Sequence, residues 1–346
     1  MSDTIHVGQT RALYVLRESR MKRLYSTVEY KRLIRIRQLR ALANTRRRRQ
    51  QRPESLPDIH LPFLTIVAPD HYSLVDNPEP AIHFLKQLQT DVVNKRLFVD
   101  LSRAQTMTCD AISVLAATIE SDLCKPHVFG NWPADPVPRQ LVIDSGFNRR
   151  MRTRESEPKP ELGTILRRDV YLGEDGATVA TGTARQLVEF ARLQLNREID
   201  DKPSYGALID VMDNTYSHAS SVMAGQVSWW GTVYCDVERN KACYCFVDLG
   251  VGIFKSKSFQ QRIRYLPKML LGKPEERLKA LLERRIPSRT GLRYRGKGLP
   301  WIYESGIAGR IESLVIIAND VYARPLRNEY RRLPQAFHGT FLYWET

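Results

Sequence analysis

Residues able to do chemistry are concentrated in three separated stretches of this chain. In the first, Asp210, Asn214 and His218 recur every four residues, and such positions lie on one face of a helix at 3.6 residues per turn. The second stretch, 248–252, reads Asp-Leu-Gly-Val-Gly, and the third, 295–299, reads Arg-Gly-Lys-Gly-Leu. Together they offer an acceptor for an amine, an oxygen ligand for a cation and a cradle for an anion, which are the needs of a nucleotide pocket.

The second and third stretches suit opposite ends of such a ligand. Asp248 follows an apolar run, and a carboxylate there can accept a hydrogen bond from an exocyclic amine while the next glycines let backbone approach a ring. In 295–299, glycines and cations precede the apolar residues 300–302, which indicate the start of a helix. Backbone N–H groups at a glycine-rich helix start bind phosphate, and Lys or Arg strengthens the binding. Either motif alone is common in turns and surface loops, so their order along the chain is what indicates one site.

An α/β scaffold is needed to position these residues, and the hydrophobic pattern of the C-terminal half predicts one. The predicted elements are helices at 183–196 and 204–219 and strands at 226–235, 242–247, 313–318 and 339–344. Alternation along the second of these strands puts Asp248 on one face with Tyr244 and Phe246, and puts Cys243 and Cys245 on the other.

A second, smaller α/β unit is predicted over 56–155. Short apolar runs at 61–67 and 96–100 flank an amphipathic stretch, and a helical stripe begins near Asp110. This pattern resembles the STAS family of sulphate-transporter and anti-sigma-antagonist domains, in which the loop before that helix carries a phosphorylated serine. Cys109 stands at that position, so the phosphoacceptor is absent and the residue is expected to be a small buried hydrophobe. A scaffold or docking role is implied for this unit.

The elements and motifs of 160–346 resemble the GHKL ATPase fold that histidine kinases, gyrase-type ATPases, mismatch-repair ATPases and anti-sigma kinases share. The resemblance implies an α/β (α+β) sandwich with a mixed sheet, and ATP and Mg²⁺ as cofactors. It implies that Asp210 is the catalytic acid that orients or deprotonates water, that Asn214 binds Mg²⁺ and that His218 is structural. Asp248 would accept a hydrogen bond from the adenine amine. The other residues implied to bind ATP are Asn214, Gly250, Gly252, Arg295, Gly296, Lys297, Gly298, Leu299 and Thr340.

The implied function is that of a bacterial, ATP- and Mg²⁺-binding regulatory ATPase that controls a partner protein or nucleic acid. Residues 256–290 resemble the mobile lid that closes over nucleotide in such proteins. Asp210 is one methylene shorter than the glutamate of many relatives, so slow hydrolysis and binding without hydrolysis are both open. One alternative is an anti-sigma-like serine/threonine protein kinase acting on a STAS-type partner. Another is a nucleic-acid-binding protein that uses its basic N-terminal arm.

That arm comprises residues 1–55, which hold fifteen Lys and Arg against four Asp and Glu, or +11 of the net charge of +15. Helix-favouring composition followed by a Pro-interrupted stretch at 52–57 predicts a largely helical arm and a linker. Residues 11–52 suit nucleic acid or acidic lipid, which basic segments bind through counterion release and charge attraction. Docking on an acidic partner protein and a merely solvated basic face are the alternatives.

Length and composition limit the number of domains and the other classes of protein to which this chain could belong. A chain of 346 residues fits two domains plus an extension, and its five cysteines form no CxxC pair. No apolar leader and no run of about 18–20 apolar residues stands out, which favours a reduced cytoplasmic protein without membrane insertion. No zinc motif, catalytic triad or P-loop pattern is evident either. The oligomeric state stays open, with a homodimer among the alternatives.

Overall fold

The computed structural model describes residues 63–91, 96–121, 128–147, 163–169, 176–196, 202–218, 228–256, 259–260, 263, 272–286 and 298–346. The predicted basic arm, and with it the expected nucleic-acid contact of residues 11–52, lies outside these ranges. So do Arg295, Gly296 and Lys297 of the predicted phosphate loop. The described part of the chain is α/β, as predicted, with one parallel and one antiparallel main sheet. The mixed sheet expected within residues 160–346 is instead antiparallel between all neighbouring described strands.

The N-terminal part of the structure, which we call the small unit (residues 63–147), is built on a parallel sheet in the order β1-β3-β5. Its elements are β1 (Phe63–Val67), β2 (His71–Tyr72), α3 (Pro78–Asp91), β3 (Arg96–Asp100), β4 (Thr106–Met107), α4 (Cys109–Glu120), β5 (Val128–Gly130) and α5 (Pro136–Asp144). The predicted β-α-β order and the helix beginning beside Asp110 are therefore confirmed. Parallel strands require such crossover helices, because the chain must return to the same edge of the sheet.

The C-terminal part of the structure, which we call the large unit (the described residues within 163–346), is built on a seven-stranded sheet in the order β11-β10-β9-β12-β8-β7-β6, with every neighbouring pair antiparallel. Its strands are β6 (Gly163–Asp169), β7 (Ser228–Asp236), β8 (Lys241–Asp248), β9 (Glu312–Ala318), β10 (Val321–Arg324), β11 (Glu329–Arg332) and β12 (Thr340–Glu345). Its helices are α6 (Gly176–Leu195), α7 (Lys202–His218), α9 (Pro274–Leu282), α10 (Gly298–Ile307) and the short η6 (Pro325–Arg327). The last strand thus lies in the middle of the sheet.

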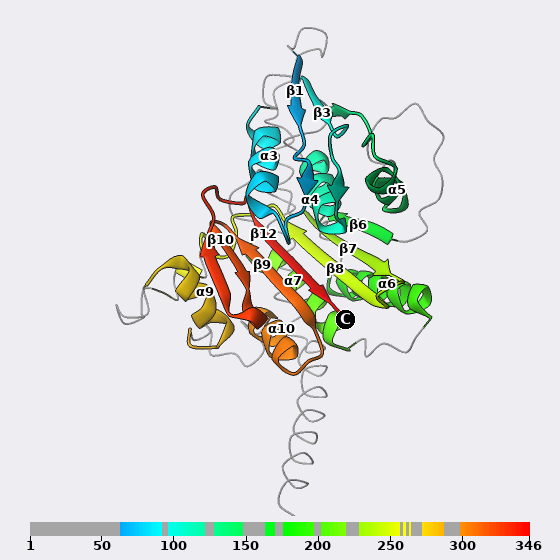
Figure 1. Cartoon of the computed structure of the whole chain (residues 1–346). Helices are drawn as coiled ribbons and strands as arrows, with labels where there is room; N and C mark the ends of the chain where they lie inside the picture. Colours follow the sequence, from blue (N-terminus) through cyan, green and yellow to red (C-terminus); the bar gives the residue numbers. More distant parts are fainter. Residues whose placement is uncertain are drawn as a thin grey trace, which may run out of the picture.

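Each face of the large sheet packs against a different layer (Figure 1). The face that carries Tyr244 and Phe246 packs on α6, α7, α9 and α10, and we call it the inner face. The face that carries Cys243 and Cys245 shares one hydrophobic cluster with the small unit, and we call it the outer face. The predicted division of the residues of β8 between two faces is therefore confirmed.

Helix α4 joins the two units. It contacts both β7 and β8, and every residue from Asp110 to Glu120 is buried. At its C-terminal end, the indole N–H of Trp230 on β7 donates a hydrogen bond of 2.8 Å to Glu120 Oε2. A helix that is buried all round lies between two layers, and α4 lies between the small sheet and the large one.

The range expected to form a lid, 256–290, contains a packed helix. Helix α9 contacts β10 and β11, and Leu278 and Leu282 on it are fully buried. Residues 257–258, 261–262, 264–271 and 287–290 of the expected lid lie outside the described part of the chain. Among the described helices, none combines the length and the hydropathy needed to cross a membrane.

Candidate functional site

Asp248 is a buried acid at the C-terminal end of β8, with 9% of its surface exposed. Its Oδ1 accepts a hydrogen bond of 2.9 Å from the backbone N–H of Gly250, and the side chain of Thr340 hydrogen-bonds the same carboxyl group. Burial raises the pKa of Asp248 to about 6, although these two hydrogen bonds oppose the shift. A carboxylate has about four acceptor positions, so this buried acid can receive further donors from a ligand.

The glycine turn after Asp248, residues 250–254, is held by Asn319 from the turn between β9 and β10. Asn319 Nδ2 donates to the carbonyl of Val251 at 2.9 Å, and Asn319 Oδ1 accepts from the backbone N–H of Phe254 at 3.1 Å. Gly252 lies in this turn at φ +75°, and a Cβ there would come within 2.5 Å of the Asn319 amide. Both the backbone angle and the available space therefore require glycine at position 252.

Gly339 fixes how closely β12 approaches the end of β8. It has φ +112°, and a Cβ on it would lie 1.9 Å from the carbonyl oxygen of Asp248. The absence of a side chain lets Thr340 pair directly with Asp248 in the ladder between β8 and β12. Thr340, one of the residues expected to bind ATP, therefore lies directly opposite Asp248.

Helix α7 carries the predicted stripe of Asp210, Asn214 and His218. Asp210 is half-buried, and of Asn214 and His218 the structure describes only the helical backbone. The first turn of α7 is fixed by Ser204 Oγ, which accepts a hydrogen bond of 3.0 Å from the indole N–H of Trp344 near the end of β12.

The position of this first turn sets where the rest of α7 lies. From Ser204 to Asn214 the helix rises about 15 Å, and from Trp344 back to Thr340 the strand spans about 14 Å. Because α7 runs along the inner face behind β8 and β12 (Figure 1), its C-terminal half reaches the end of the sheet at which Asp248 lies. The helix stripe and the strand acid are therefore brought to the same end of the large unit.

Helix α10 begins where the sequence predicted, at the end of the cationic glycine loop. Gly298 and Leu299 form its buried first turn, and the helix packs against α7. The contact is close, since a Cβ on Gly206 of α7 would lie 2.6 Å from the ring of Trp301. The N-terminus of α10 is thereby held beside the helix that carries Asn214.

Within the described ranges, no group of three or more His, Cys, Asp and Glu residues is arranged to hold a metal ion.

A cavity of about 530 Å³ lies elsewhere, between the small unit and the outer face of the large sheet. Its wall includes Thr108, Cys109, Asp110, Arg324, Tyr343 and Glu345. Cys109 is half-buried there at the start of α4, whereas Asp110 is almost fully buried. The cavity does not reach Asp248, because that residue shares the inner face with Tyr244 and Phe246.

Sequence reasoning missed Asn319, which positions the glycine turn. An Asn-Asp pair after the apolar run of β9 is a turn signal, but it does not reveal that the amide reaches residues 251 and 254. Searches with protein-family models and against curated proteins find no match to this chain.

Proposed function

We propose that the large unit binds ATP with Mg²⁺ in the manner of GHKL ATPases, and that nucleotide binding regulates the activity of the chain. The observation that carries this proposal is the buried Asp248, which is held by Gly250 and Thr340 beside the glycine turn. A desolvated acid with a raised pKa at the end of a strand is typical of a binding site, because burial without a ligand lowers stability.

The adenine end of the ligand fits the described residues. The exocyclic amine would donate to Asp248, and the ring would lie against the glycine turn, where Gly252 leaves no side chain in the way. The phosphates would lie toward the N-terminus of α10, since free backbone N–H groups of a helix start attract anions. Arg295, Gly296 and Lys297 precede that helix directly and would add charge.

The cation end depends on α7. Asn214 would supply one oxygen to Mg²⁺, and the phosphates and water would supply the rest. Bound Mg²⁺ would neutralise phosphate charge. Asp210 lies one turn earlier on the same helix and would orient water, with slow hydrolysis as the expected outcome because its carboxylate is short.

The proposal is tested by calorimetric titration of the full chain with ATP, with and without Mg²⁺. Wild-type protein is expected to bind ATP more tightly with Mg²⁺, and Asp248→Ala is expected to abolish measurable binding. Asp135→Ala is the matched control, because Asp135 is an exposed acid that caps α5 in the small unit. Absence of ATP binding by the wild-type chain, or unchanged binding by Asp248→Ala, would refute the proposal.

The fate of the γ-phosphate is tested separately with radiolabelled ATP. Slow release of free phosphate, lost in Asp210→Asn, is the result expected for a regulatory ATPase. Label on a STAS-type protein added to the reaction would instead support the protein-kinase alternative.

A further inference from the structure

One short strand, β10, is attached at one end to the glycine turn and at the other end to the small unit. At its first end, Asn319 makes two hydrogen bonds to the glycine turn, to Val251 and Phe254. Asn319 is 5% exposed, so water replaces these bonds poorly if they break. A shift of the glycine turn is therefore expected to carry Asn319 with it.

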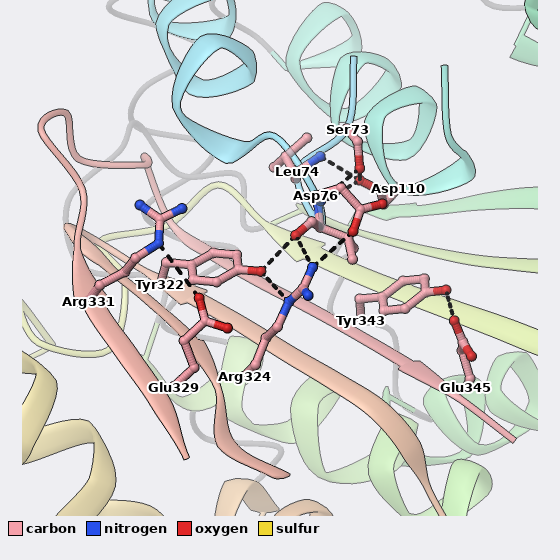
Figure 2. A network of polar contacts seen from close by, with 11 residues as sticks. Ser73, Leu74, Asp76, Asp110, Tyr322, Arg324, Glu329, Arg331, Tyr343 and Glu345 are labelled. Carbon is pink, nitrogen blue, oxygen red and sulfur yellow. Dashed lines mark hydrogen bonds and ion pairs between the residues drawn. The ribbon is translucent and has the colours of Figure 1, made fainter. Parts of the chain in front are cut away.

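At its other end, β10 holds the turn of residues 73–76 in the small unit (Figure 2). The hydroxyl of Tyr322 donates to the carbonyl of Val75 at 2.6 Å. Arg324 donates to Tyr322 Oη at 2.6 Å, to the same Val75 carbonyl at 2.7 Å and to Asp76 at 2.9 Å. We call these contacts of Tyr322 and Arg324 the β10 clamp. Three hydrogen bonds from these two side chains converge on one short turn, so the clamp fixes its position.

The clamped turn is also bound to α4. Asp110 Oδ2 accepts hydrogen bonds from the backbone N–H groups of Leu74 at 2.6 Å and Val75 at 3.2 Å, and from Ser73 Oγ at 3.4 Å. Asp110 is 2% exposed and is the second residue of α4. The turn thus connects the β10 clamp directly to the first turn of the helix that packs on the large sheet.

Neighbouring contacts make the clamp rigid. The guanidinium group of Arg331 on β11 lies 4.7 Å from the centre of the Tyr322 ring, and it also forms an ion pair with Glu79 in the first turn of α3. Tyr322 itself is 2% exposed. A side chain held on its face and at its hydroxyl has little freedom to absorb a displacement of its strand.

We propose that the small unit senses the nucleotide state of the Asp248 site through β10. The route runs from the glycine turn to Asn319, along β10 to Tyr322 and Arg324, and then to the turn of residues 73–76 and Asp110. This inference rests on the proposed function, since it requires nucleotide to change the glycine turn. The partner that reads the nucleotide is then part of the same chain.

The test is hydrogen–deuterium exchange of the full chain, with and without saturating ATP and Mg²⁺. The reporters are peptides covering residues 70–80 and 107–115, which include the N–H groups of Leu74 and Val75 bound by Asp110. We expect ATP to change exchange in both peptides of wild-type protein by about fivefold or more, the lower end of common coupling between sites. Calorimetry on the same samples reports whether ATP is bound.

Two variants cut the clamp and one control leaves it intact. Tyr322→Phe removes only the hydroxyl, and Arg324→Met keeps much of the aliphatic stem. Both variants are expected to bind ATP, but ATP should no longer change hydrogen–deuterium exchange at residues 70–80. Gln335→Ala removes a contact between the units that does not involve β10, the 2.9 Å hydrogen bond to His83, and is expected to keep that change.

The outcomes separate this inference from the proposed function. If wild-type protein binds ATP but exchange changes only within the large unit, the coupling is refuted and the nucleotide site stands. If both clamp variants keep the full change in the small unit, β10 is not the route. If wild-type protein binds no ATP, the proposed function fails and the inference fails with it.

Discussion

Asp248 and Thr340 are directly opposed in the ladder between β8 and β12, and the threonine side chain hydrogen-bonds the buried carboxyl group. The two residues are brought together because the last strand of the chain enters the middle of the sheet. Gly339 makes this possible, since any side chain there would strike the Asp248 carbonyl. Asp248 therefore gains its Thr340 partner only when the C-terminal strand β12 has paired with β8.

Replacing this acid by its amide is expected to stabilise the protein. Burial raises the pKa of Asp248 to about 6 in the folded protein, so the carboxyl group keeps its proton to higher pH in the folded protein than in the unfolded chain. The contribution of this proton to the free energy of unfolding is fully present below about pH 4 and is lost as the pH rises to about 6. Above about pH 6 the folded protein holds an unfavourable buried charge. Asp248→Asn is therefore expected to gain up to about 3 kcal/mol of unfolding free energy at pH 7.5.

Urea unfolding at pH 7.5 and pH 4.5 measures this gain, which should shrink at the lower pH. Asp135→Asn is the control and should change little, because Asn and Asp are similar helix N-caps. Equal stability of Asp248→Asn and wild type at pH 7.5 would contradict the buried-charge interpretation.

ATP affinity is expected to depend on the same ionisation. A hydrogen bond from the adenine amine is stronger to a carboxylate than to a neutral carboxyl group. Affinity should therefore be highest above about pH 6 and about three- to tenfold weaker at pH 5, as Asp248 becomes protonated. Calorimetric dissociation constants between pH 5 and pH 7.5 check this trend, and a flat profile for the wild-type chain would count against it.

Gly252 is expected to be far less replaceable than Gly309, although both have positive φ. A Cβ at 252 meets the Asn319 amide at 2.5 Å, whereas a Cβ at 309 meets nothing within 4 Å. Gly309→Ala should cost about 1 kcal/mol from backbone strain alone, and Gly252→Ala about 2–4 kcal/mol because the clash is added. Urea unfolding of the two variants measures the difference. Similar losses of unfolding free energy in the two variants would show that the Asn319 side chain can move away from residue 252 without destabilising the protein.

A second glycine pair tests the packing of α10 on α7. Gly206→Ala places a methyl group 2.6 Å from the ring of Trp301, while Gly182→Ala on α6 meets open space. Gly182→Ala should stabilise the protein by about 0.5–1 kcal/mol through helix propensity. Gly206→Ala should destabilise it by about 1–3 kcal/mol and weaken ATP binding. Thermal unfolding of the two variants measures both changes in stability. A stabilising effect of Gly206→Ala would contradict the close contact between Gly206 and Trp301.

Much of the fold follows from local pattern. Alternation in β8 separated Cys243 and Cys245 from Tyr244 and Phe246, because residues two apart share a face of a strand. Apolar residues at helical spacing predicted α7 and the start of α4, because residues three and four apart share a face of a helix. The glycines at 250 and 252 marked the turn after Asp248, since turns of this kind need positive φ or close backbone approach.

Contacts between distant parts of the chain could not be predicted in this way. The Tyr322 hydroxyl and the Val75 carbonyl are 247 positions apart, and nothing in the pattern of either segment names its partner. Strands β10 and β11 are only four residues long, too short to show a clear period. Helix α4 was recognised as a stripe, but its burial on all sides depends on the large sheet that packs against it.

The adenine amine is the group that most directly tests the role of Asp248. Inosine triphosphate carries a carbonyl oxygen in place of that amine and a hydrogen on N1, so the position expected to face Asp248 offers an acceptor instead of a donor. Calorimetry should show wild-type protein binding ATP about 10- to 100-fold more tightly than inosine triphosphate. In Asp248→Asn this preference should shrink or invert, because the amide can donate to the oxygen. Equal affinity of the wild-type chain for both nucleotides would contradict the account.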